Sequence, residues 1–247
     1  HPGYGPQAEN AEFADLCEQC GIKFIGPSAE AIRKMGDKSI ARRTMQDAGV
    51  PVVPGSEGEL QSLEEARECA HKVGFPLRLK ASAGGGGRGM RVVHAIDQLE
   101  EAWQMSRLEA RNAFTSDAVY MERSIETARH IEIQVLGDEQ GNIVYLGERE
   151  CSIQRRHQKL LEESPSPVVD EDLRRRLGET AIAGAASVGY YSAGTIEYLV
   201  DENLDFYFME MNTRIQVEHP VTEMVTGIDL VKQQIRIAAG QSLDFTQ

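Results

Sequence analysis

Two glutamates lie in apolar stretches that a short acidic loop joins, a spacing that favours a metal-binding pair. Glu197 lies in the first stretch and Glu210 in the second. If Asp201 pairs with Phe206 across the loop, the two carboxylates face each other with Cβ atoms about 5 Å apart. Carboxylates this close repel by roughly 3 kcal/mol at an effective dielectric of 20, so we expect a divalent cation between them, with Asn212 adding an oxygen. The alternative is two solvated strand residues.

A glycine-rich run at residues 84–89 follows Lys80 on a predicted strand. It satisfies G-x-G-x-x-G, but residues 90–94 read as a strand rather than the helix of a dinucleotide-binding fold, and no P-loop motif occurs. Between two strands, such a loop can fold over phosphates as a flap and donate backbone N–H groups. The ammonium of Lys80 would then neutralise phosphate oxygens. The alternative is a flexible hairpin with a solvated lysine.

A third pattern, residues 214–220, offers a cation, an amide and a base. If this segment is extended, Arg214, Gln216 and Glu218 lie on one side. The guanidinium can hold an anion in a bidentate manner, and Glu218 can accept a proton from that anion. Residues 154–159 add a dense basic cluster, for which a solvated loop is the alternative.

Apolar periodicity and capping residues predict the elements that position these groups. Ser62 and Glu65 form a capping box, and Asp97 with Glu100 another. Helices are predicted at residues 28–35, 37–48, 63–73, from 97 onward, 171–188 and 228–239. Strands are predicted at residues 76–82, 90–94, 119–122, 130–136, 143–150, 195–200 and 206–211. The fold class is α+β.

The composition is that of a globular protein: of 247 residues, 41% are hydrophobic and 26% charged. A net charge of −13 argues against nucleic acid and anionic membrane as partners, and no apolar stretch reaches the roughly 20 residues of a membrane span. Four cysteines indicate a reducing compartment, by default the cytosol. The turn-rich start, residues 1–5, reads as the middle of a fold, so we expect a fragment of a longer protein.

Together these motifs closely resemble biotin carboxylase, an ATP-grasp enzyme. The resemblance rests on residues 1–5, 35–38, Lys80 with the glycine run, 154–159 and 210–220, and covers essentially the whole chain. It implies an ATP-grasp fold in which a small glycine-flap lid domain covers a larger, mainly antiparallel sheet with helices. The implied parts are the end of an N-terminal domain with connecting helices (1–52), the lid subdomain (53–124) and an incomplete catalytic subdomain (125–247).

The resemblance also implies the activity. ATP would phosphorylate bicarbonate to carboxyphosphate, whose CO₂ carboxylates biotin on a biotin carboxyl carrier protein or domain. The implied cofactors are ATP and Mg²⁺ or Mn²⁺, with biotin as substrate. The parent would serve an acetyl-CoA, propionyl-CoA or pyruvate carboxylase, the first of these in fatty acid biosynthesis, in the cytoplasm or the mitochondrial matrix. A homodimer is also implied.

Residue roles carry over from the family by position. The ATP-binding residues would be Lys38, Lys80, Gly85, Gly86, Gly87, Met90, Glu122, Arg123, His130, Gln154, His157 and Leu199. Those that bind bicarbonate would be Lys159, Arg214, Gln216, Val217 and Glu218. Within this set Glu218 would act as the base, with Arg214 and Lys159 as further catalytic residues. The metal ligands would be Glu197, Glu210 and Asn212.

The chain departs from the family pattern at residues 6–8 and at Arg78, where an apolar residue is usual. Most of the family's N-terminal domain and the end of its C-terminal domain are absent, so we expect the fragment to keep the nucleotide and bicarbonate groups but to be catalytically impaired. Two alternatives stay open at this stage. One is another bicarbonate-activating ATP-grasp ligase, similar to carbamoyl phosphate synthetase, and the other is a non-catalytic nucleotide-binding module.

Overall fold

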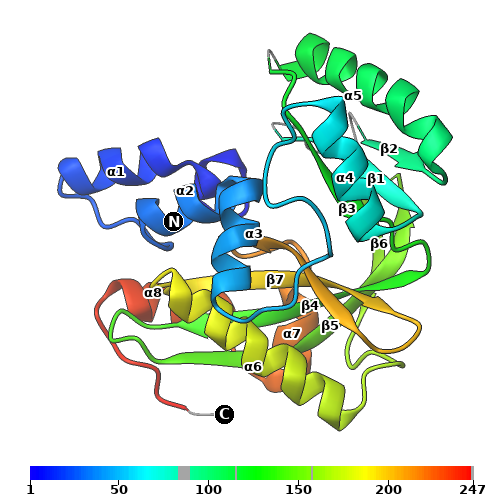
Figure 1. Cartoon of the computed structure of the whole chain (residues 1–247). Helices are drawn as coiled ribbons and strands as arrows, with labels where there is room; N and C mark the ends of the chain where they lie inside the picture. Colours follow the sequence, from blue (N-terminus) through cyan, green and yellow to red (C-terminus); the bar gives the residue numbers. More distant parts are fainter. Residues whose placement is uncertain (83–89, 115, 157, 246–247) are drawn as a thin grey trace. The chain divides into compact units, whose positions relative to one another are not determined.

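The computed structural model describes residues 1–82, 90–114, 116–156 and 158–245 (Figure 1). The chain folds into two compact units, one formed by residues 1–52 with 128–247 and the other by residues 53–127. The first and third predicted parts therefore fold together in one unit. The predicted ATP contacts Gly85, Gly86, Gly87 and His157 lie outside the described residues.

An antiparallel sheet of five strands, in the order β6-β5-β4-β7-β8, forms the centre of the larger unit (Figure 1). The strands are β4 (Ala128–Gly137), β5 (Ile143–Arg155), β6 (Gln158–Glu163), β7 (Ser192–Asp201) and β8 (Phe206–Asn212). Strand β6 was not predicted from the sequence, because its residues are mostly polar and partly exposed and show little apolar alternation.

The larger unit also contains the 3-10 helix η1 and six described α-helices (Figure 1). Their bounds are η1 (Pro6–Glu9), α1 (Ala11–Gln19), α2 (Ala29–Gly36), α3 (Lys38–Asp47), α6 (Glu171–Ser187), α7 (His219–Thr226) and α8 (Leu230–Ala238). Two of the predicted helices begin with a side-chain cap: the side chain of Ser28 accepts from Ala31 N, and that of Asp37 from Ser39 N and Ile40 N. Lys38 thus lies in the first turn of α3, as predicted. The predicted capping box of Asp97 and Glu100 is wrong, because Ala95 precedes a short 3-10 helix there without a side-chain cap.

Alternation along the strands divides the sheet into an apolar face and a polar face. Ile131 and Ile133 of β4 and Ile196 of β7 are fully buried in the main core with residues of α6, among them Leu173 and Leu177. The intervening residues face the other side, and they include His130, Glu132, Gln134, Thr195 and Glu197. The strand period therefore gathers the polar residues of β4 and β7 on one face.

The smaller unit is a three-stranded antiparallel sheet with two α-helices among its described residues. Its elements are α4 (Leu63–Val73), β1 (Leu77–Ala81), β2 (Met90–Val93), η2 (Ile96–Gln98), α5 (Leu99–Phe114) and β3 (Val119–Arg123). Leu77 and Leu79 are buried in its core with Trp103 of α5. The even-numbered residues of β1 face away from that core. Arg78 there is half-buried, and its Nε donates to the hydroxyl of Ser124 at 3.1 Å.

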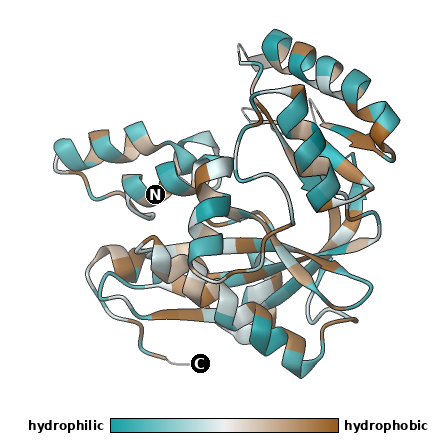
Figure 2. Ribbon diagram, viewed as in Figure 1, coloured by the Kyte–Doolittle hydropathy of each residue, from teal (hydrophilic) through white to brown (hydrophobic). Residues whose placement is uncertain are grey.

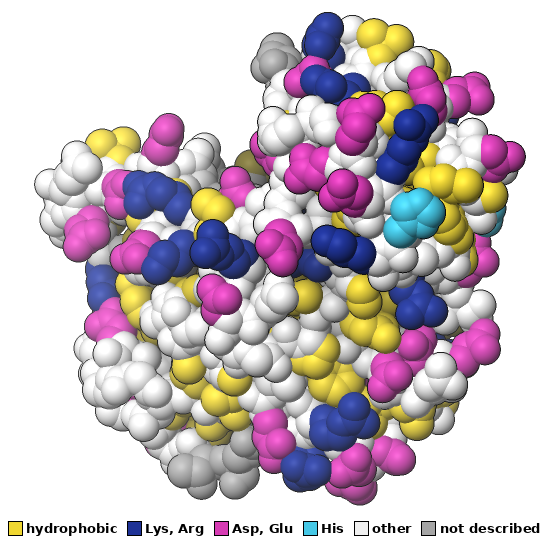
Figure 3. Space-filling model, viewed as in Figure 1, with side chains coloured by type: hydrophobic (Ala, Val, Ile, Leu, Met, Phe, Trp, Pro, Cys, Tyr) yellow, Lys and Arg dark blue, Asp and Glu magenta, His cyan; other side chains and the backbone are white. Residues whose placement is uncertain are grey.

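Apolar residues fall mainly on one side of each helix, so hydrophilic and hydrophobic colours alternate along the ribbons (Figure 2). The face in Figure 3 shows acidic and basic side chains interspersed over both units. In the part of the chain that the structure describes, the helices are too short or too polar to cross a membrane.

Candidate functional site

Four charged side chains form a row across the polar face of the larger sheet. Arg149 of β5 pairs with Glu132 of β4, which pairs with Glu197 of β7, which pairs with Glu210 of β8. Directly paired residues bring their Cβ atoms to about 5 Å on one face of a sheet. The row therefore places three carboxylates and one guanidinium next to one another.

The predicted pairing of Glu197 with Glu210 is confirmed, although the predicted loop between the strands is wrong by one residue. Val200, rather than Asp201, pairs with Phe206, so the start of β8 is shifted by one residue from the predicted register. A bulge that leaves Met209 unpaired corrects the shift and returns Glu210 to its place opposite Glu197. Bulges are common beside functional sites because they re-aim a side chain.

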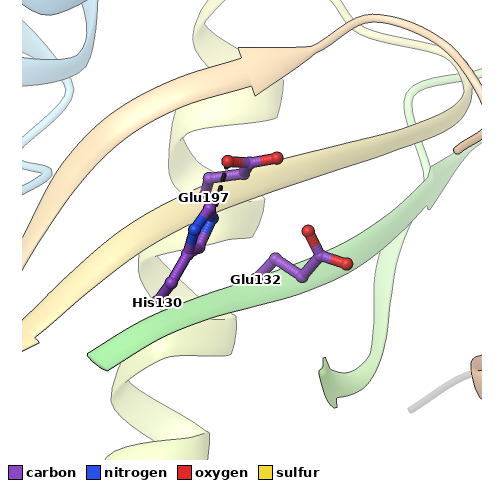
Figure 4. A group of neighbouring side chains, drawn as sticks. All are labelled: His130, Glu132 and Glu197. Atoms are coloured by element: carbon purple, nitrogen blue, oxygen red, sulfur yellow. Dashed lines mark ion pairs between the residues drawn. The ribbon is translucent and has the colours of Figure 1, made fainter. Parts of the chain in front are cut away.

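Glu197 is buried, and its carboxylate contacts four side-chain nitrogen atoms. Figure 4 shows the ion pair between Glu197 and His130, with Glu132 beside them. Its Oε2 lies 2.6 Å from Nε2 of His130, and its Oε1 lies 2.9 Å from Nζ of Lys159. Oε1 also accepts from the amides of Asn212 at 2.8 Å and Gln216 at 3.0 Å. Burial alone would raise the pKa of Glu197, but the hydrogen bonds and charges of His130 and Lys159 lower it to about 2.

The pKa of Glu210 is shifted in the opposite direction to that of Glu197. Burial, together with the charge of Glu197, raises the pKa of the Glu210 carboxyl above its usual value, and the Lys38 ammonium offsets only part of this effect. Lys38, Glu210 and Asn212 line a cavity of about 260 Å³ between α2, α3 and β8. Two carboxylates in a pair, one of them poorly compensated, with an amide oxygen nearby suit a hard divalent cation.

Lys159 lies among three carboxylates. Its Nζ donates to Glu132, to Glu197 at 2.9 Å and to Glu218 at 2.6 Å, so each of its three N–H groups has an acceptor. Burial opposes the charge, but the neighbouring carboxylates raise the pKa of Lys159 well above its usual value. The ammonium is therefore charged and held in one direction.

A hairpin presents Lys159 to these carboxylates. Gln154 of β5 pairs with Lys159 of β6, and Arg155 pairs with Gln158. Arg156 follows with a φ of 53°, in the left-handed conformation that is common in turns. Residues 154, 155, 158 and 159 therefore lie in strands rather than in a loop, although the side chains of 155, 156 and 158 are exposed. Nε2 of Gln154 forms a hydrogen bond of 2.7 Å with Nδ1 of His130, so these two predicted ATP-binding residues are in contact.

The segment predicted to be extended, residues 214–220, is not a strand. Residues 213–218 are irregular and α7 begins at His219, with a proline in its first turn. Pro220 is the second residue of α7, where a backbone N–H would have no acceptor within the helix, so the proline costs no hydrogen bond there. Glu218 becomes the N-cap residue and Val217 is left exposed.

The irregular backbone still brings Arg214, Gln216 and Glu218 to the site. Nε of Arg214 donates to Glu9 at 2.8 Å and its Nη2 to Oδ1 of Asn212 at 3.3 Å. Burial alone would raise the pKa of Glu218, but the hydrogen bond and charge of Lys159 hold that pKa below its usual value. Glu218 is thus an ionised carboxylate at neutral pH.

Two further predicted residues of the larger unit are placed by their strands. Leu199 of β7 is half-buried and pairs with His130 of β4, so the two lie side by side. The hydroxyl of Ser152 accepts from the backbone N–H of His130 at 2.9 Å, which fixes that end of β4 against β5.

The smaller unit carries its own predicted site residues. Lys80 of β1 forms an ion pair with Glu122 of β3 and lies 5.9 Å from the ring centroid of Tyr120. Met90 of β2 pairs with Lys80 on the other side. The side chain of Arg123 is exposed at the end of β3. Lys80 therefore lies on the central strand of a small three-stranded sheet.

The fold and the site can now be compared with known proteins. The family described as "Carbamoyl-phosphate synthase L chain, ATP binding domain" matches residues 37–246, which is most of the chain. The chain belongs to this family. The family described as "Biotin carboxylase, N-terminal domain" matches residues 1–32.

Relatives extend this assignment to biotin carboxylases. The chain is 58% identical over 247 residues to a biotin carboxylase of Nostoc sp., covering 55% of that protein. Its structure matches the biotin carboxylase of Campylobacter jejuni with a TM-score of 0.92 at 56% identity, over 98% of this chain and 55% of that one. The chain thus spans about half the length of these relatives.

A second solved structure matches equally well. It is the biotin carboxylase domain dimer of the Hydrogenobacter thermophilus 2-oxoglutarate carboxylase, described as a complex with MgADP, ADP and bicarbonate. The TM-score is 0.92 at 53% identity, over 100% of this chain and 55% of that chain. The resemblance to biotin carboxylase and the predicted α+β ATP-grasp fold are confirmed.

Three residues of the site in this ATP-grasp chain, Glu9, Glu132 and Arg149, were not predicted from the sequence. Glu132 could have been predicted, because it follows His130 by two residues on a strand and therefore lies on the same face. Arg149 lies in the charged run 148–150, where the sequence does not distinguish a buried arginine from a solvated one. Glu9 comes from the N-terminal segment, and only the tertiary structure brings it to Arg214.

Proposed function

We propose that this chain is the ATP- and bicarbonate-binding part of a biotin carboxylase, which carboxylates biotin at the expense of ATP by way of carboxyphosphate. One observation carries the proposal. Glu197, Lys159 and Glu218 belong to one hydrogen-bonded network that reaches Gln216, so the candidate metal pair and the candidate bicarbonate residues form a single site. The structural relative that is described as binding MgADP and bicarbonate supports this reading.

The residues suit activation of bicarbonate. Arg214, Lys159 and Gln216, with the backbone of Val217, would hold the anion through N–H groups. The Glu218 carboxylate would take the proton from the bicarbonate hydroxyl, and the resulting oxygen anion would attack the terminal phosphorus of ATP. The bond from that phosphorus to the bridging oxygen breaks, giving ADP and carboxyphosphate. Lys159 would keep Glu218 ionised and aimed at the anion.

The nucleotide contacts are proposed residue by residue from the resemblance. We assign Lys38, Lys80 and His130 to the phosphates or ribose, with Gln154 and His157 nearby. Glu122, Arg123 and Leu199 would line the adenine site. Met90 and the glycines at positions 85–87 would complete the phosphate-binding flap.

Glu197 and Glu210 would hold Mg²⁺ or Mn²⁺, with Asn212 as a third oxygen ligand. The raised pKa of Glu210 fits this role, because it shows a carboxylate whose charge the protein itself does not balance. When bound, the cation supplies charge neutralisation for phosphate oxygens.

Partners and setting belong to the same proposal. The carboxylated biotin would be carried by a biotin carboxyl carrier protein or domain, in an acetyl-CoA, propionyl-CoA or pyruvate carboxylase. The dimer described for the Hydrogenobacter relative supports a homodimer. The expected compartment is the cytoplasm, with the mitochondrial matrix as the eukaryotic counterpart.

The test is ADP release from MgATP, measured with and without bicarbonate and then with and without free biotin. Glu218→Gln is the matched variant, because it keeps the shape of the side chain and removes the base. We expect bicarbonate-dependent ADP release that the variant loses. The addition of free biotin then tests whether the second half-reaction takes place in this chain.

Two other outcomes favour the alternatives. Stimulation by ammonia rather than biotin would favour a ligase of the carbamoyl phosphate synthetase type, which the name of the matched family keeps in view. Tight binding of MgATP without bicarbonate-dependent ADP release would favour a non-catalytic nucleotide-binding module and would overturn the proposed activity for this chain.

A further inference from the structure

Arg149 has no role in the proposed chemistry, yet its side chain is fully buried at 0% exposure within the site. An arginine has five N–H donors and no acceptor. Nε donates to Glu132, Nη1 to Gln134 at 2.8 Å and Thr222 at 2.7 Å, and Nη2 to Thr195 at 3.3 Å and Gln216 at 2.8 Å. Every donor has an acceptor, so the guanidinium is locked in place.

The contacts of Arg149 with Gln216 and Glu132 determine how Gln216 and Lys159, two of the proposed bicarbonate-binding residues, are oriented. Because the guanidinium can only donate, Gln216 must turn its oxygen toward Arg149. Its amide nitrogen then faces Glu197, to which it donates at 3.0 Å. Glu132 accepts from Arg149 with one oxygen and from Lys159 with the other, so the carboxylate links the two cations.

The backbone is shaped to place Arg149 there. Gly147 adopts a φ of 82°, which an L side chain rarely tolerates, and β5 carries an extra residue where it pairs with β4 around Gln134. After this bulge Arg149 lies directly opposite Glu132. Without the extra residue, the side chain would point to the apolar face of the sheet.

We propose that Arg149 is a positioning residue for the bicarbonate step, an inference that rests on the proposed function. It does not touch substrate. It fixes the amide of Gln216 and, through Glu132, the ammonium of Lys159, so that both present N–H groups in the direction the anion needs. A planar guanidinium is required, because a lysine ammonium cannot reach Glu132 and Gln216 from one point with the same geometry.

The experiment compares Arg149→Lys with the wild-type chain in the ADP-release assay, with bicarbonate and ATP varied separately. We expect the KM for bicarbonate to rise about tenfold or more, with the KM for ATP unchanged. Arg174→Lys is the matched control. Arg174 also holds a buried carboxylate, that of Glu148, with two nitrogens, but lies away from the site on α6. Its variant is expected to lose stability without changing the KM for bicarbonate.

The wild-type chain is measured first, so that a failure of the proposed function can be distinguished from a failure of the positioning role of Arg149. Without bicarbonate-dependent ADP release in the wild type, the proposed function falls and this inference falls with it. If the wild type is active and folded Arg149→Lys keeps the wild-type KM for bicarbonate, only the positioning role is overturned.

A second variant decides the matter if Arg149→Lys does not fold. Thr195→Val with Thr222→Val removes two of the hydroxyl acceptors that hold the guanidinium but keeps its charge and its contacts to Glu132 and Gln216. The positioning role predicts a rise of roughly threefold in the KM for bicarbonate alone. A lower melting temperature with both Michaelis constants unchanged would show that Arg149 is only structural.

Discussion

Two lysines assigned to the nucleotide and bicarbonate sites have very different surroundings. Lys159, in the larger unit, donates to Glu132, Glu197 and Glu218, and its side chain is 18% exposed. Lys80, in the smaller unit, is paired with one carboxylate, that of Glu122, over the ring of Tyr120. Among the described residues, therefore, the first ammonium has a full set of acceptors and the second has one carboxylate.

The difference suggests two ways of preparing a cation for an anionic ligand. Protein groups hold Lys159 before any ligand binds, so its contribution is orientation, and removing it leaves Glu218 without its ion-pair partner. Lys80 keeps N–H groups that a phosphate can use, so its contribution is made mainly on binding. Each of the following predictions tests one side of this comparison.

The largest effect is expected for Lys159→Met. Loss of the cation removes the ion-pair partner of Glu218, whereas Glu132 keeps Arg149 and Glu197 keeps His130. Breaking a buried ion pair in this way costs about 3 to 5 kcal/mol of the free energy of unfolding. Urea denaturation measures the loss, with the exposed Lys232→Met in the same unit as the control, expected to stay within about 0.5 kcal/mol. A loss no greater than that of the control would contradict the network.

The acid side of the stability curve should reflect Glu197. Its carboxyl has a pKa of about 2 in the folded chain against 4.5 as the reference value, so the unfolded chain binds more protons between these values. Stability should therefore fall as the pH drops from about 5 toward 2, by about 3 kcal/mol for this group. Urea denaturation at several pH values should show a shallower fall in Glu197→Gln. Parallel curves would count against the assignment.

Glu210 should act in the opposite direction. Because its folded pKa is raised, its contribution is present below the usual pKa and is lost as the pH rises through the higher folded value. At pH 8 without divalent cations, Glu210→Gln should raise the free energy of unfolding by about 1 kcal/mol. Thermal unfolding in EDTA measures this change in stability, and the same measurement is repeated with Mg²⁺. The exposed Glu202→Gln is the control.

The addition of Mg²⁺ sharpens this test. The cation should stabilise the wild type and not Glu210→Gln, since the variant lacks one of the two carboxylates. Equal stabilisation of both would place the cation elsewhere.

The smallest effect on stability is expected for Lys80→Met. Its ion pair with Glu122 is partly exposed, so the loss should be about 1 kcal/mol or less. The affinity for MgATP should nevertheless fall about tenfold, since a phosphate contact is lost. Calorimetric titration compares it with Lys72→Met, an exposed lysine of α4 that should bind as the wild type does. Unchanged affinity in Lys80→Met would remove Lys80 from the site.

Local patterns were sufficient for much of the fold. The caps at Ser28, Asp37 and Ser62 begin the predicted helices, because a capping side chain satisfies backbone N–H groups within its own turn. The alternation of β1 and β7 puts Lys80 and Glu197 on the polar faces of their sheets, because successive side chains point to opposite sides. These are interactions over a few residues, which the sequence displays directly.

The sequence by itself therefore predicted the candidate site residues and determined most of the helices and strands that hold them. Only the tertiary structure decided how they meet: the bulge at Met209, the helix that begins at His219, and the burial of Arg149. The physical reason is range. A cap or a strand period acts between neighbours, whereas the acceptors that make a buried guanidinium tolerable come from β4, β7, α7 and an irregular segment, far apart in the chain.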